Sequence, residues 1–145
     1  MTNTVTISYI LDTTNPMAEL GFEAWVDDTK FVDIEHVTEK QQISIQIPDT
    51  AADHELRFVL KNKTDKHTRV DENNDIISDS TLTITNLLFD EIKLGHMLTS
   101  LAVYRHNFNG HGNPTEDKFY SSLGCNGTVS LKFATPLYLW LLEHM

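Results

Sequence analysis

The feature of this sequence that most constrains its fold is an alternation of apolar and polar residues with a period of two. Five segments show it, at residues 4–11, 19–27, 42–47, 55–61 and 128–133. Successive side chains of a β-strand point to opposite faces of the sheet, so each segment would bury one face and expose the other to water. The pattern therefore predicts short, half-buried strands.

Turn-forming residues separate these segments, and residues 80–94 add a strand–turn–strand unit rich in Thr and Ile. We expect seven or eight short strands in total, with no strong helical pattern between them. The predicted fold is all-β: an antiparallel β-sandwich or jelly roll with a short C-terminal extension. The alternation predicts a core that contains Ile7, Phe22, Ile43, Ile45, Leu56, Phe58, Ile84, Leu131 and Phe133.

The length of 145 residues suits one domain with a substantial core. A loop rich in Gly and Asn at residues 107–114 is the only plausible linker, and the stretch after it is too short to bury a core of its own. We therefore expect a single domain over residues 1–145. Residues 1–95 would form the sandwich core, and residues 96–145 an extension that packs on it.

The secondary structure of residues 136–145, PLYLWLLEHM, stays open at this stage. A helix would place Leu137, Leu141 and His144 on one face. Strand alternation fits Leu137, Leu139 and Leu141 equally well.

This C-terminal segment also predicts a protein contact. It holds six consecutive apolar or aromatic residues, and one strand face or one helical stripe buries about half of such a run. The remainder would form an apolar patch of the kind that interfaces use. We expect a homo-oligomer or a larger assembly with Tyr138 and Trp140 as contact residues. The alternative is that the segment is buried within its own subunit.

The charge of the chain argues against several partners. The formal net charge is −10, with 21 acidic and 11 basic side chains, whereas nucleic acids and anionic membranes attract basic surfaces. We therefore expect neither partner. The N-terminus lacks the basic start and apolar stretch of a secretory signal, and the single cysteine, Cys125, cannot form an internal disulfide. These features predict a protein that is not secreted through a signal peptide and that is made in a reducing compartment.

Three segments in the first 95 residues resemble the layout of carbohydrate-binding-module jelly rolls. They are AWVDDTK at residues 24–30, the strand ending IQIPD at residues 45–49, and HELRFVLKNKT at residues 54–64. The resemblance implies a sandwich that binds sugar with the help of calcium. The chain departs from a calcium-dependent xylan binder because it has no clear aromatic platform.

Three later segments resemble small uncharacterised structural proteins of large tailed, T4-like marine phages. They are LTITNLLFDEIKLG at residues 82–95, YRHNFNGHGN at residues 104–113, and the stretch from residue 117 to the end. The resemblance implies a component of a phage particle, assembled in the host cytoplasm and located in the virion. It identifies no chemistry.

One acidic stretch is a candidate calcium (Ca²⁺) site. It offers oxygen ligands at positions one, three, five and nine of a loop, but Ile76 and Leu82 stand where an EF-hand has Gly and Glu. It is therefore either an irregular calcium loop or a solvated acidic hairpin loop. The candidate ligands are Asp71, Asn73, Asp75 and Asp79.

Trp25 is the candidate contact residue of the N-terminal half. It is out of phase with the apolar residues around it, so it points from the opposite face of its strand, either as an exposed ring or into a second buried face. Asp27 and Asp28 follow as a predicted hairpin turn. They would form a second cation site only if the fold brought them near Asp71.

Nothing in the sequence predicts catalysis. Cys125 stands between turn-forming residues, and the sequence shows no recognisable base for its thiol. His106 and His111 do not have the spacing of a zinc site. The predicted function is therefore a non-catalytic β-sandwich interaction module, a structural component of a phage particle. The alternative is a calcium-dependent carbohydrate-binding module.

Overall fold

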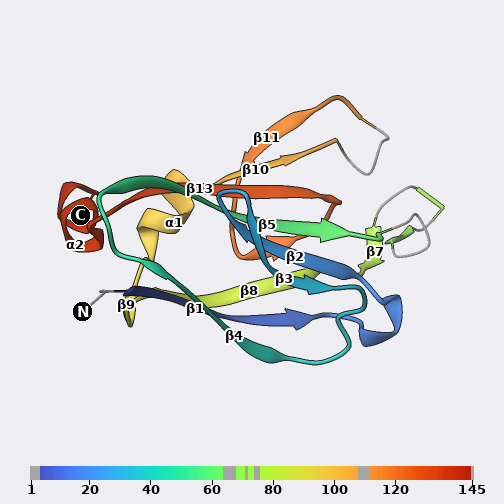
Figure 1. The fold of residues 1–145 in the computed structure, drawn as a ribbon. Coiled ribbons are helices and arrows are strands. Elements are labelled where there is room, and N and C mark those ends of the chain that lie inside the picture. The colour runs from blue at the N-terminus through green and yellow to red at the C-terminus, as the bar shows by residue number, and fades with distance from the viewer. Residues whose placement is uncertain (1–3, 64–67, 71, 74–75, 108–111, 145) are drawn as a thin grey trace.

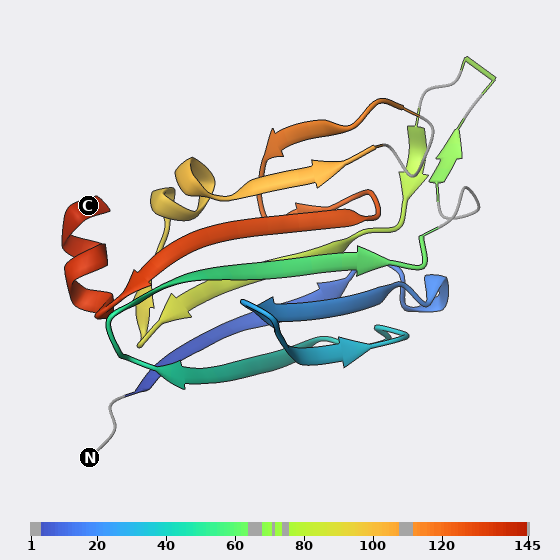
Figure 2. The same cartoon turned by 45° about the horizontal axis from the view of Figure 1, so that its top comes forward.

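The structure is a computed structural model that describes residues 4–63, 68–70, 72–73, 76–107 and 112–144. Two antiparallel sheets pack face to face (Figures 1 and 2). One is five-stranded, with the order β12-β8-β1-β4 and β9 paired to β8. Its strands are β1 (Thr4–Thr13), β4 (Gln41–Pro48), β8 (Leu82–Phe89), β9 (Ile92–Lys93) and β12 (Ser122–Leu123).

The second sheet is six-stranded, with the order β11-β10-β13-β5-β2-β3. Its strands are β2 (Gly21–Val26), β3 (Thr29–Ile34), β5 (Ala52–Lys61), β10 (Val103–His106), β11 (Thr115–Lys118) and β13 (Gly127–Thr135). A separate hairpin is formed by β6 (Thr68–Val70) and β7 (Ile76–Asp79). The helical elements are the 3-10 turn η1 (Pro16–Ala18), α1 (His96–Leu101) and α2 (Leu137–His144). The predicted antiparallel β-sandwich with a short C-terminal extension is thus confirmed.

The core lies between the sheets and follows the predicted alternation. Of the residues predicted to be buried, all are buried except Ile43, which is partly exposed. Ile43 belongs to β4, an edge strand, so no neighbouring strand covers its outer side. An aromatic cluster joins the sheets, because the ring of Tyr9 on β1 lies 4.9 Å from Phe58 on β5 and 6.2 Å from Phe22 on β2.

The boundary predicted between residues 95 and 96 is wrong. β13 lies in the middle of the six-stranded sheet, where it pairs with β5 over residues 127–135 and with β10 on its other side. Residues after 95 therefore supply β10, β11 and β13 to the sandwich itself. The order of strands depends on contacts between distant segments, and apolar periodicity carries no information about it.

The segment whose structure the sequence left open is the helix α2. Leu137, Trp140 and Leu141 are buried, whereas His144 is exposed. The ring of Trp140 lies 6.3 Å from Phe89 on β8 and 6.1 Å from Phe133 on β13, so α2 closes one end of the sandwich (Figure 1). Among the described residues, no helix has the length and apolar character needed to cross a membrane.

Candidate functional site

An open pocket of about 850 Å³ lies at the end of the sandwich that α2 closes. We call it the α2 pocket. Its polar wall comes from the side of β5 and β13 that faces away from the core, and α1 and β10 supply the apolar Leu101 and Val103. The lining also includes Asp53, His54, Glu55, Arg105, Lys132 and His144.

Three exposed charged side chains of this pocket, Glu143 on α2 and the pair Asp53 and Lys132, have no hydrogen bond or ion pair to another described residue. The pair Asp53 and Lys132 belongs to the six-stranded sheet. They lie on the neighbouring strands β5 and β13, where Lys132 is opposite Glu55 and Asp53 is opposite Ala134. The pocket therefore offers an acidic acceptor and a basic donor on adjacent strands.

His54 connects three segments at one edge of the pocket. Its Nδ1 lies 2.7 Å from Oδ2 of Asp27, and its Nε2 lies 3.1 Å from Oγ1 of Thr135. Its ring stacks on Phe133 at 5.2 Å. These contacts fix the start of β5 to the β2–β3 turn and to the end of β13.

Asp27 is a turn residue, as predicted for the hairpin between β2 and β3, and it has a positive φ of 55°. Its Oδ1 accepts from the backbone N–H of Glu55 at 2.9 Å, and its carbonyl accepts from Arg57 at 2.6 Å. Partial burial opposes its ionisation, but hydrogen bonds from His54 and from the backbone of Glu55 outweigh burial and hold the pKa of Asp27 below its ordinary value. Asp28, beside it, is exposed.

The second cation site suggested at Asp27 and Asp28 does not fit the topology. Asp27 lies beside Glu55 at the start of β5, whereas the β6–β7 hairpin follows the opposite end of that strand. The six residue steps of β5 from Glu55 to Lys61 cover about 20 Å at roughly 3.3 Å per step. Figure 1 shows the hairpin at the end of the molecule that is remote from α2.

Half of the predicted calcium ligands fall outside the described residues. Asp71 and Asp75 are not among them, Asn73 is exposed in a turn, and Asp79 ends β7. Among the residues that the structure describes, no group of three or more His, Cys, Asp or Glu side chains is arranged to hold a metal ion. The calcium site therefore stays a prediction.

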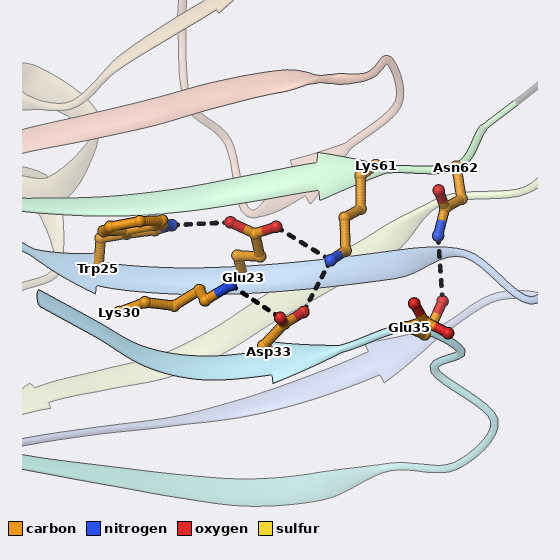
Figure 3. A network of polar contacts seen from close by, with 7 residues as sticks. All are labelled: Glu23, Trp25, Lys30, Asp33, Glu35, Lys61 and Asn62. Atoms are coloured by element: carbon orange, nitrogen blue, oxygen red, sulfur yellow. Dashed lines mark hydrogen bonds and ion pairs between the residues drawn. The ribbon is translucent and has the colours of Figure 1, made fainter.

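Trp25 points away from the core, as its phase predicts, and joins a polar network on the outer face (Figure 3). Its Nε1 donates to Glu23 at 2.8 Å, Lys61 donates to Glu23 and to Asp33 at 2.9 and 2.7 Å, and Lys30 donates to Asp33 at 2.8 Å. Hydrogen bonds from Lys61 and Trp25 hold the pKa of Glu23 below its ordinary value. Those from Lys30 and Lys61 lower the pKa of Asp33 to about 2.

The indole ring of Trp25 is flanked by cations. The guanidinium carbon of Arg57 lies 5.2 Å from the ring centroid, and Nζ of Lys30 lies 5.7 Å from it. These cation–π contacts help to hold the indole ring in its position. Trp25 is therefore a fixed part of the outer face, and its predicted role as a contact residue stays a prediction.

The two predicted contact residues of α2 differ in exposure. Tyr138 is 56% exposed, together with Leu139 and Leu142, whereas Trp140 is 6% exposed. The prediction of Trp140 as an interface anchor is wrong, because its ring packs between the two sheets. It contributes to the wall of the α2 pocket instead.

Cys125 lies in a bend at which the Tyr104 hydroxyl accepts from the backbone N–H of Cys125 at 2.8 Å and donates to its carbonyl. His106 is paired with Asp117 through Nε2 at 2.7 Å, and His111 lies outside the described residues. These contacts hold the bend at Cys125 against β10 and join β10 to β11.

Sequence reasoning missed Asp53, His54 and Lys132. The alternation alone places Asp53 and Lys132 on the outward faces of their strands, so the sequence did indicate that both are exposed. The pattern could not show that β5 and β13 are neighbours.

Comparison with known proteins identifies the fold. No protein-family model matches the chain, and no curated protein is significantly similar to it. Among solved structures, the selenomethionine form of vCBM60 matches with a TM-score of 0.55 and 12% identity, over 88% of this chain and 89% of that one. It is described with two families of calcium-dependent carbohydrate binding modules linked by circular permutation. vCBM60 in complex with galactobiose matches with a TM-score of 0.53 and 12% identity, over 87% and 96% of the two chains.

Proposed function

We propose that this chain is a non-catalytic carbohydrate-binding module whose sugar ligand lies in the α2 pocket. The observation that carries the proposal is the pair Asp53 and Lys132, which line this pocket with no partner among the described residues. The shared fold with a carbohydrate-binding module supports it, although a fold alone does not determine function.

The chemistry of the pocket suits a sugar. Each hydroxyl group of a sugar both donates and accepts hydrogen bonds, so it can donate to the carboxylate of Asp53 and accept from the ammonium of Lys132. The C–H faces of the ring can pack on Leu101 and Val103. Concave sites with apolar walls and a few convergent polar groups are typical of small-molecule binding.

Calcium is part of the proposal. Asp71, Asn73, Asp75 and Asp79 would supply carboxylate and amide oxygens, which are the ligands that calcium prefers. The ion would stabilise the loop that carries these residues. The structural neighbour is described among calcium-dependent modules, which supports this reading.

A second candidate function is assembly, as a homo-oligomer or a structural component of a phage particle located in the virion. The observation that favours it is the exposed apolar row of Tyr138, Leu139 and Leu142 on α2. Soluble monomers rarely expose contiguous apolar patches, and interfaces use them. This contact would lie on the side of α2 that faces away from the sandwich.

The carbohydrate proposal is tested by isothermal titration calorimetry with galacto-, xylo- and gluco-oligosaccharides. Asp53→Asn and Lys132→Met should each weaken binding by about tenfold, the effect of losing one charge-assisted hydrogen bond. Glu39→Gln and Lys40→Met are matched controls, because both residues are exposed in the loop between β3 and β4 and outside the α2 pocket. Equal loss in the controls, or no binding of any sugar by the unaltered protein, would overturn the proposal.

A further inference from the structure

A second open pocket lies next to the first on the six-stranded sheet. We call it the β11 pocket, and its volume is about 630 Å³. It lies among β10, β11 and the start of β13, and its lining includes Asn107, Thr115, Glu116 and Gly127. The carboxylate and amide side chains of this lining have no role in the function proposed above.

Arg105 lines both pockets and therefore marks the place where they meet. Its side chain is half-exposed, with Nε donating to Glu116 at 3.0 Å and Nη1 to Ser130 at 3.4 Å. Along β10, Val103 belongs to the α2 pocket, Arg105 to both pockets, and His106 to the β11 pocket. The two hollows thus follow one another along a single strand.

The combined length of the α2 pocket and the β11 pocket can be measured along β13. Gly127 lines the β11 pocket and Ala134 lines the α2 pocket, at opposite ends of that strand. Seven residue steps in an antiparallel strand cover about 24 Å at roughly 3.4 Å per step. A single sugar unit would occupy only a part of such a site.

From this arrangement we infer that the protein binds a linear oligosaccharide chain that lies along β10 and β13, with Arg105 at its middle. The inference rests on the proposed function, and it adds the β11 pocket as a second subsite. The planar guanidinium of Arg105 presents several donors to the chain where it passes from one pocket to the other. Ligand length is then a determinant of affinity, because the second pocket adds contacts without a second loss of rotational and translational freedom.

The test compares disaccharides and hexasaccharides of the galacto, xylo and gluco series by isothermal titration calorimetry on the intact chain. In the series that binds, the hexasaccharide should bind at least about tenfold more tightly than the disaccharide. The variant Asn107→Trp places a large ring in the β11 pocket. It should bring the hexasaccharide down to the affinity of the disaccharide and leave the disaccharide unaffected.

Gln46→Trp is the control, because Gln46 is exposed on β4 in the other sheet. A measurement that needs no variant is amide NMR of the unaltered protein, in which the hexasaccharide, but not the disaccharide, should shift the signals of Asn107 and Gly127. Equal affinity for the two lengths would overturn the inference and leave the proposed function intact. Failure of all three series to bind would overturn the proposed function itself.

Discussion

His54 and Asp27 form a short contact of 2.7 Å between the start of β5 and the β2–β3 turn, at the edge of the α2 pocket. The residues are 27 positions apart in sequence. The same carboxylate also accepts from the backbone N–H of Glu55. One charged side chain thus holds a turn against the strand that carries the pocket.

Asp27→Asn should destabilise the protein at pH 7 by about 1–2 kcal/mol, the cost of weakening hydrogen bonds to a charged group. Asn tolerates the positive φ at this position, so the change mainly removes charge. Because the pKa of Asp27 is lowered in the folded protein, its contribution is present above the unfolded pKa and is lost as pH falls through the folded pKa. Urea unfolding at pH 7 and pH 3 measures both effects, and an equal destabilisation at the two pH values would contradict the assignment.

The pKa of Asp33 should be about 2 in the unaltered protein, because Lys30 and Lys61 both donate to its carboxylate. Carboxyl-carbon NMR titration measures it directly. In the double variant Lys30→Met and Lys61→Met the pKa should rise toward its ordinary value of 3.8. Lys40→Met, which changes the same kind of charge in the β3–β4 loop, should leave the titration of Asp33 unchanged.

Tyr9→Phe should raise the free energy of unfolding by about 1 kcal/mol. The Tyr9 hydroxyl is buried in the core and has no hydrogen-bond partner among the described residues, and its burial also raises the pKa of the phenol. Removal of the hydroxyl ends this desolvation cost and keeps the ring contacts with Phe58. Phe58→Ala is the opposite control, with an expected loss of about 3–5 kcal/mol. Destabilisation by Tyr9→Phe in urea unfolding would show that the hydroxyl has a partner.

Calcium should raise the melting temperature, and a chelator should lower it to the ion-free value. An ion that binds only the folded state stabilises it by about 2.7 kcal/mol at 100 times its Kd. The double variant Asp71→Asn and Asp75→Asn should abolish the shift, whereas Asp28→Asn, in the β2–β3 turn, should preserve it. If the unaltered protein melts at the same temperature with excess calcium and with chelator, the solvated-loop alternative holds.

Leu139→Glu together with Leu142→Glu should weaken self-association by at least about tenfold if α2 forms the contact between copies. Both side chains are exposed, so the fold should be retained. Leu141→Ala, at a buried position of the same helix, should instead lower stability by about 2–5 kcal/mol. Light scattering gives the mass in solution, and an unaltered protein that is monomeric at high concentration would exclude this contact.

The alternation in the sequence was sufficient to predict the sandwich, and eight of the nine residues that it assigned to the core are buried. It placed Phe22 inside and Trp25 outside on the same strand, because consecutive side chains of a strand point to opposite faces whatever the strand pairs with. Ile43 was the one residue wrongly assigned to the core. It is partly exposed because β4 is an edge strand, and the position of a strand is a property of the whole sheet.

The tertiary structure alone decided how the strands are ordered and where polar groups converge. β13 lies between β5 and β10, so Lys132 comes beside Glu55 and near Asp53, although these residues are far apart in the chain. α2 likewise became a helix with Trp140 inside because the open end of the sandwich offered Phe89 and Phe133 as partners. Periodicity is a local property that each strand carries by itself, whereas a pocket requires a particular pairing of distant strands, and that pairing is selected by the packing of the whole core.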